Sequence, residues 1–73
     1  MNKSYYNAES NLIARRLRQL RKERGLSQEE LAAQLQLLGV DISQPLISKI
    51  EQNRRFVKEY ELTCICQVLP VSL

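Results

Sequence analysis

Four short segments with apolar residues at helical spacing restrict what this chain can fold into. They span residues 11–25, 26–38, 44–53 and 57–69. Residues that stop a helix end or follow each segment: Gly25, the Gly-Val-Asp-Ile run after residue 38, Asn53 and Pro70. A chain of 73 residues forms one domain, and only two glycines and two prolines argue against a turn-rich all-β fold. We therefore predict an all-α domain of four or five helices over residues 10–73, after a flexible tail at residues 1–9.

The first two segments each carry a buried stripe. Ile13, Leu17 and Leu20 share one face of the first. In the second, Ser27 is followed three residues later by Glu30, which predicts a capping box at the helix start. The apolar stripe of this second helix consists of Leu31, Leu35 and Leu38, with Ala32 beside it.

The third segment predicts a short helix with two different sides. Ser43 is a candidate N-cap, and Pro45 would then be the second helical residue, where a missing N–H costs nothing. At about 100° per residue, Ile47 and Ile50 face inward. The opposite side carries Pro45, Ser48, Lys49 and Gln52, with Gln44 at its flank.

The fourth segment predicts a helix with Leu62, Ile65, Cys66 and Leu69 on one arc, ended by Pro70. We interpret Cys66 as filling a small core position and Cys64 as half exposed, both as reduced thiols of a cytoplasmic protein. The chain has no His and no further Cys, so we expect no metal and no cofactor. Without His, a glycine-rich phosphate loop or paired acids beside a nucleophile, we do not expect an enzyme.

Positive charge gathers in two places. Residues 11–24 contain six Lys or Arg and one acid, and residues 43–58 contain four and one, although the whole chain carries only +3. Two basic segments on an otherwise acidic chain favour a polyanionic partner. We interpret Arg15, Arg18 and Lys22 as a solvated helix face and leave them out of the predicted site.

Two sequence stretches then point to a family. "IARRLRQLRKERGLSQEELAAQL" followed by "SQPLISKIEQNRR" resembles the lambda-repressor-like helix-turn-helix family, which contains phage repressors, Cro proteins and XRE-type regulators. The resemblance covers about residues 11–69. It implies that the second and third helices form a helix-turn-helix that binds double-stranded DNA. It also implies a transcriptional regulator of bacterial or phage origin, repressor-like, that acts as a homodimer on a two-half-site operator.

The resemblance also implies roles for individual residues. Gln28 matches a phosphate-binding glutamine, and the helix that begins after Ser43 matches the recognition helix of the major groove. Arg21 and Glu51 match a structural ion pair, and Ala32 matches a small residue that lets two helices approach. The implied DNA-binding residues are Gln28, Ser43, Gln44, Pro45, Ser48, Lys49, Gln52, Arg54 and Arg55.

Two departures from the family pattern leave an alternative open. The connection between Leu31 and Ser43 is about five residues longer than the usual turn, and Pro45 replaces a side chain that forms hydrogen bonds. The longer connection, together with Leu12 and Leu37 at positions expected to be exposed, favours an alternative function. In that alternative the fold is a protein-interaction module, antirepressor-like or antitoxin-like, without specific DNA binding.

Overall fold

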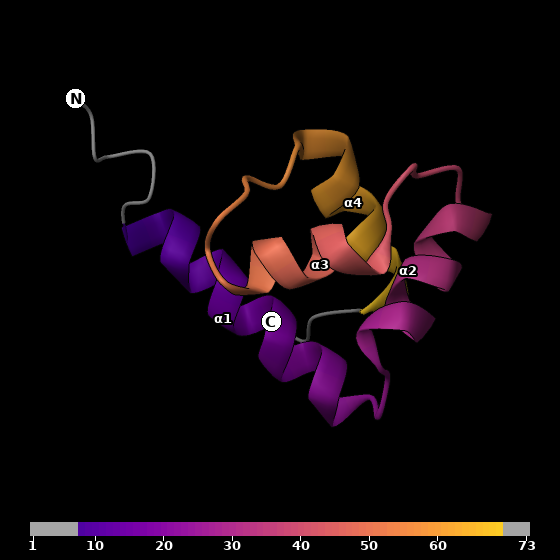
Figure 1. Cartoon of the computed structure of the whole chain (residues 1–73), viewed down its shortest axis with the longest axis horizontal. Helices are drawn as coiled ribbons and strands as arrows, with labels where there is room; N and C mark the ends of the chain where they lie inside the picture. The colour runs from indigo at the N-terminus through magenta and orange to yellow at the C-terminus, as the bar shows by residue number, and fades with distance from the viewer. Residues whose placement is uncertain (1–7, 70–73) are drawn as a thin grey trace.

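The computed structural model describes residues 8–69, with side chains from residue 12 onward. Within that range lie four helices and no strand: α1 (Ala8–Glu23), α2 (Gln28–Leu37), α3 (Gln44–Glu51) and α4 (Glu59–Val68) (Figure 1). This confirms the predicted all-α, four-helix fold. α1 begins at Ala8, inside the segment predicted as a tail, and residues 1–7 lie outside the described part. No described helix has the length and apolar character that crossing a membrane requires.

Three helices end in the same way. Gly25 and Gly39 follow α1 and α2 with φ of 70° and 88°, and Asn53 follows α3 with φ of 60°. At each end two backbone N–H groups bond back to the last turn, as Gly39 N to Gln36 O and Val40 N to Leu35 O do, both at 3.0 Å. This is the Schellman motif, which favours glycine or asparagine at the left-handed position. The helix stops predicted at Gly25 and Asn53 are therefore confirmed.

The core lies where α2 and α3 meet α1 and α4. α3 packs against both α1 and α2, and α2 packs against α4. The shared core consists mainly of aliphatic side chains: Leu17, Leu31, Ala32, Leu35, Val40, Ile42, Ile47, Ile50, Ile65 and Leu69. Burial of this kind contributes about 1.5–3 kcal/mol for each large aliphatic side chain, so α3 is held by its inner side.

The long connection between α2 and α3 is itself anchored in the core. Val40 and Ile42 are buried, and the Gln36 side chain donates to the Ile42 carbonyl at 2.7 Å. The prediction that Leu38 belongs to the buried stripe is wrong, because α2 ends at Leu37 and Leu38 is 45% exposed. The chain turns at Gly39, and Val40 and Ile42 fill the core positions that a longer helix would have offered.

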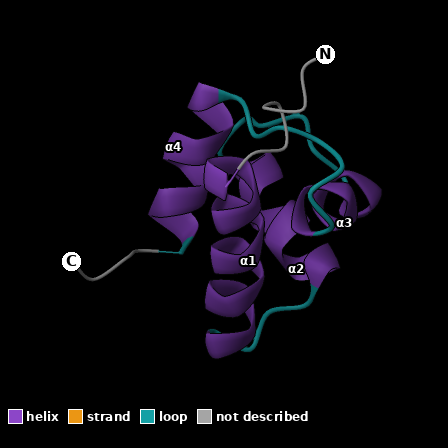
Figure 2. Ribbon diagram, turned by 90° about the vertical axis from the view of Figure 1, so that its left-hand side faces the viewer, coloured by secondary structure: helices purple, strands orange, loops and turns teal. Residues whose placement is uncertain are grey.

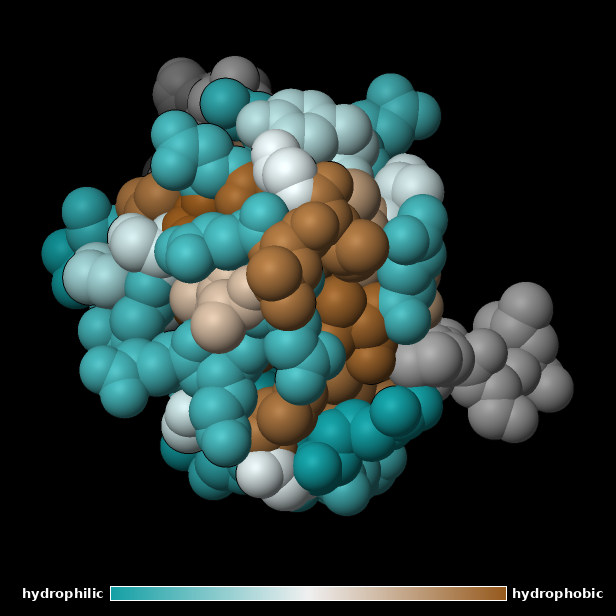
Figure 3. All heavy atoms as spheres, turned by 90° about the vertical axis from the view of Figure 1, so that its right-hand side faces the viewer, coloured by the Kyte–Doolittle hydropathy of each residue, from teal (hydrophilic) through white to brown (hydrophobic). Residues whose placement is uncertain are grey.

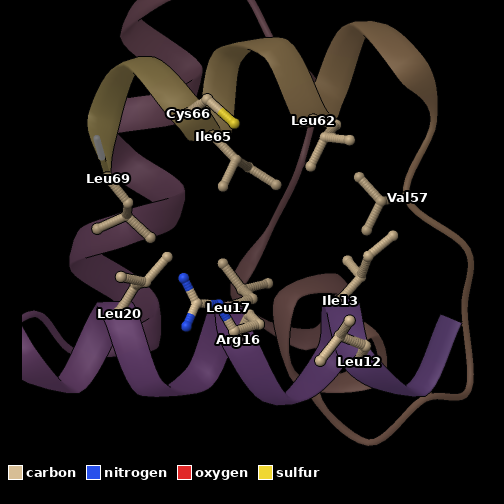
Figure 4. Close-up of a pocket in the computed structure, with 10 residues that line it drawn as sticks. All are labelled: Leu12, Ile13, Arg16, Leu17, Leu20, Val57, Leu62, Ile65, Cys66 and Leu69. Atoms are coloured by element: carbon tan, nitrogen blue, oxygen red, sulfur yellow. The ribbon is translucent and has the colours of Figure 1, made fainter. Parts of the chain in front are cut away.

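An apolar groove lies between α1 and α4. Its cavity measures about 200 Å³, and its lining includes Ile13, Leu62 and Cys66 (Figure 4). All three are exposed, although the sequence predicted them to face inward. The reason is that these side chains line an open groove between α1 and α4, which no described residue fills. The Cys66 prediction is therefore wrong, whereas Cys64 is half-buried as predicted.

Candidate nucleic-acid interface

α3 presents one side to the core and the other to solvent. Ile47 and Ile50 are at most 1% exposed, whereas Pro45, Lys49 and Gln52 are exposed. Ser48 and Gln44 are half-buried at the edge of this outer side. Pro45 is the second residue of the helix, as predicted. The result is a short helix whose solvent side is polar and carries one positive charge, that of Lys49.

Ser43 precedes α3 but does not cap it with its side chain. Its backbone is extended, with φ of −120° and ψ of 170°, and its carbonyl accepts from Ile47 N at 3.0 Å. The hydroxyl makes no capping hydrogen bond, which differs from the capping role predicted for Ser43. Pro45, which lacks an N–H group, already removes one of the orphan donors that a cap would satisfy.

A chain of hydrogen bonds joins α1, α2 and α3 beneath this surface. Arg21 Nε and Nη2 donate to the two carboxylate oxygens of Glu51 at 2.7 and 3.0 Å, and Arg21 Nη1 donates to the Leu26 carbonyl. Gln28 Nε2 donates to Glu51 Oε1 at 3.0 Å, and Gln28 Oε1 accepts from Gln44 Nε2 at 2.7 Å. The start of α2 is thereby tied to the start of α3.

The Arg21–Glu51 ion pair is present with bidentate geometry, and both side chains are at most 10% exposed. The hydrogen bonds that Arg21 donates to Glu51 raise the pKa of Arg21 above its ordinary value, against the opposing effect of burial. A bidentate arginine–carboxylate pair is among the stronger polar contacts in proteins. Because the two charges cancel locally, this pair adds no net charge to the surface above it.

A polar cavity of about 220 Å³ opens next to this network. It is lined by Arg18, Arg21, Gln28, Ser48, Glu51 and Gln52. Arg18 is exposed and is its only cation not paired with Glu51. The cavity also lies beside the first turn of α2, whose leading N–H groups have no intrahelical acceptor. Arg18 is exposed, as its interpretation as part of a solvated face predicts, but the approach of α1 to α3 also places it in the lining of this cavity, which the sequence did not indicate.

The segment after α3 continues the polar surface. Gln52 Nε2 donates to Ser48 Oγ at 2.8 Å, and Arg54 Nη1 approaches Gln52 Oε1 at 3.4 Å. Arg54 is exposed. These contacts join Ser48, Gln52 and Arg54 into one row at the end of α3.

Arg55, a predicted DNA contact, forms an ion pair within the protein. Its two terminal nitrogens each donate to one oxygen of the Glu61 carboxylate at 3.0 Å, and Glu61 is only 1% exposed. Burial opposes ionisation of Glu61, but the hydrogen bonds from Arg55 and from Lys58 N lower its pKa below the ordinary value. Arg55 therefore joins the α3–α4 loop to α4, and its DNA contact stays a prediction. The sequence shows the spacing between Arg55 and Glu61, but it does not indicate that Glu61 is buried.

Metal binding has no support in the described part of the chain. Among those residues, no group of three or more His, Cys, Asp or Glu side chains lies close enough to hold an ion. The site consists instead of amides, hydroxyls, one lysine and two exposed arginines, which are donors and acceptors suited to phosphates and base edges.

Two helices tied at their starts, the second with a polar outer side, define a helix-turn-helix protein. A family model described as "Helix-turn-helix domain" matches residues 12–73. The chain belongs to this family, within the XRE and lambda-repressor-like group. No curated protein and no solved structure gives a significant match.

Proposed function

We propose that this protein binds double-stranded DNA sequence-specifically and regulates transcription, with α3 in the major groove. One observation carries the proposal: Gln28, Gln44 and Lys49, from the starts of α2 and α3 and the outer side of α3, stand on a framework held by Ile47 and Ile50. Family membership supports DNA binding in general. The spacing and chemistry of these three side chains support the proposal that the binding is sequence-specific.

The proposed contacts divide by the part of the DNA that they touch. Gln44 and Lys49 face base edges, where a glutamine amide pairs with adenine and a lysine donates to guanine. Pro45 offers only its ring, which suits an apolar contact with a thymine methyl group. Gln28, Ser43, Ser48, Gln52 and Arg54 face phosphates, joined by Arg18, and these contacts position the helix without reading sequence.

We further propose that the protein is a repressor-like regulator that acts as two copies on a roughly symmetric operator in the cytoplasm of a bacterium or in a phage-infected cell. Two-fold operators pair naturally with two copies of a helix-turn-helix module. The proposal assigns it a binding function and no catalysis.

Selection of bound sequences from a random duplex pool tests the proposal. We expect one enriched half-site, present twice with fixed spacing, and an affinity that falls steeply as salt rises because phosphate contacts release counterions. Recovery of unrelated sequences with no enriched motif would contradict specific binding.

A second candidate function rests on the apolar groove between α1 and α4. Leu12 is 58% exposed at its edge, and Ile13 and Leu62 are exposed within it. A second exposed apolar area lies near the end of α2, where Leu37 is 86% exposed (Figure 3). Apolar surfaces of this kind favour protein partners. Binding of a protein partner at high salt, with no affinity for DNA, would select this alternative.

A further inference from the structure

We propose that Glu51 determines which base Gln44 selects, although Glu51 itself does not contact DNA. It would act through Gln28, by fixing the direction of two side-chain amides in sequence. This inference rests on the proposed DNA-binding function. It assigns Glu51 a positioning role that its ion pair with Arg21 does not by itself require.

The first step is the acceptor chemistry of the Glu51 carboxylate. Both of its oxygens accept hydrogen bonds from Arg21, and a carboxylate accepts hydrogen bonds but donates none. The side chain of Glu51 is 4% exposed, so water has little access as a substitute partner. Gln28 lies 3.0 Å from Glu51 Oε1 and can meet it only with its NH₂ group. The opposite amide orientation would place two acceptors against each other.

The second step is the contact between Gln28 and Gln44, through which the orientation of the Gln28 amide fixes that of the Gln44 amide on α3. With its nitrogen committed to Glu51, Gln28 presents its oxygen to Gln44, and the 2.7 Å contact between them requires Gln44 to donate. One N–H of Gln44 is thereby occupied. Glu51 therefore sets the orientation of the Gln44 amide through Gln28, because the Glu51 carboxylate only accepts hydrogen bonds.

The third step concerns the donor and acceptor groups of the Gln44 amide that remain for a DNA base. A glutamine amide has two N–H donors and one carbonyl oxygen, so one N–H and the oxygen remain. Adenine presents in the major groove one acceptor, N7, and one donor, the N6 amino group, and this pair matches. Guanine presents two acceptors, N7 and O6, and the Gln44 oxygen would face one of them. The network therefore favours adenine over guanine at the position that Gln44 reads.

The experiment compares base preference at one position of the selected operator. Gln44→Ala locates that position, as the one whose preference it removes. We then expect Glu51→Gln to lower the adenine-to-guanine preference there by about tenfold, within the range of a bidentate contact. A neutral amide at residue 51 can present either its oxygen or its nitrogen to Gln28, so both orientations of Gln44 become accessible. Preferences at all other positions should stay within twofold.

A second variant separates positioning from folding. Gln28→Met removes the amide in the middle of the network but leaves the Arg21–Glu51 pair in place. It should lower affinity for every sequence, because a phosphate contact is lost, and it should also remove the adenine preference at the Gln44 position. Glu59→Gln, the same change of charge at an exposed residue of α4, is the matched control and should keep the preference.

The outcomes separate this inference from the function on which it rests. If the wild-type protein enriches no sequence, the proposed function fails, and the inference fails with it. If the wild type enriches a motif but Glu51→Gln and Gln28→Met both keep the adenine preference, only the inference is overturned. A Gln44→Ala protein with an unchanged motif would also overturn it, since Gln44 would then read no base.

Discussion

Individual side chains on the outer side of α3 make different contacts in the proposed complex. Lys49 is exposed and carries the only charge of that side. A lysine directed at a base edge contributes to sequence choice, whereas one directed at a phosphate contributes to affinity for every sequence.

We predict that Lys49→Ala weakens binding to the selected operator by roughly 1–3 kcal/mol and relaxes choice at one base pair. The physical reason is the loss of a donor to guanine. Fluorescence anisotropy titration at fixed salt, with the operator and single-base variants, measures both effects. Equal weakening on all duplexes would assign Lys49 to a phosphate instead.

Arg18 is predicted to contribute to affinity for every sequence and not to sequence choice. Arg18→Ala should weaken binding to all duplexes alike and reduce the slope of log K against log salt by about 1, because one phosphate contact is lost. Arg15→Ala is the matched control: Arg15 is also exposed on α1 but does not line the polar cavity. If both variants change the slope equally, Arg18 has no special place in the site.

The limits of prediction from sequence are clearest at single residues. The inward direction of Ile47 and Ile50 followed from helical spacing alone. The partner of Arg55 did not, because a sequence does not tell whether a cation six residues before a buried acid turns back to it or points outward. Family resemblance supplied the Arg21–Glu51 pair, but the Gln28–Gln44 contact appeared only in three dimensions.

At the scale of the elements, the α3–α4 loop depends on the buried Arg55–Glu61 pair. We predict that Glu61→Gln lowers the free energy of unfolding at neutral pH by about 3 kcal/mol, since it leaves Arg55 without its anion. Arg55 is partly exposed, with a side chain 22% accessible, so hydration keeps the loss from being larger. Urea unfolding measures it.

The same pair predicts how stability changes with pH. The pKa of Glu61 is lower in the folded protein than its ordinary value of 4.5. Its contribution is therefore complete above that value and is lost as pH falls through the lower, folded-state pKa. The wild type and Glu61→Gln should approach one another in stability on acidification. A constant difference between them would rule out ionisation of Glu61 as the cause.

The turn after α2 gives a backbone prediction. Gly39 has φ of 88°, and a Cβ atom there would meet no neighbour within 4 Å. Gly39→Ala should therefore destabilise the fold by about 1 kcal/mol through backbone conformation alone. Gly39→Asn is the control and should cost less, because asparagine tolerates this region, as Asn53 does at the end of α3. Thermal unfolding distinguishes the two variants.

Element boundaries were predictable where the chain carries local signals. The capping box of α2 is present: Glu30 N donates to Ser27 Oγ at 3.0 Å and Ser27 N donates to Glu30 Oε1 at 2.8 Å. No local signal placed Val40 and Ile42 in the core, because a loop has no periodicity from which to infer burial. Leu38 was wrongly predicted to be buried, because its apolar side chain and its spacing from Leu31 suit a helix that continues.

For the whole molecule, the arrangement of helices separates two surfaces. α3 and α4 lie on different sides of the molecule in Figure 2, so the polar surface of α3 and the apolar groove beside α4 are distinct. Helical periodicity predicted the number and order of the helices. It did not predict the groove, because the spacing of Ile13, Leu62 and Cys66 is typical of core positions. Only the three-dimensional structure shows that these residues line an open groove between α1 and α4.

The most direct test of the central claim is an NMR titration of the isotopically labelled protein with its selected duplex. We expect the largest amide shift changes in α3 from Gln44 to Gln52, at the start of α2 around Gln28, and at Arg18. Changes confined to the residues of the α1–α4 groove, with α3 unaffected, would contradict the claim that the outer side of α3 enters the DNA groove.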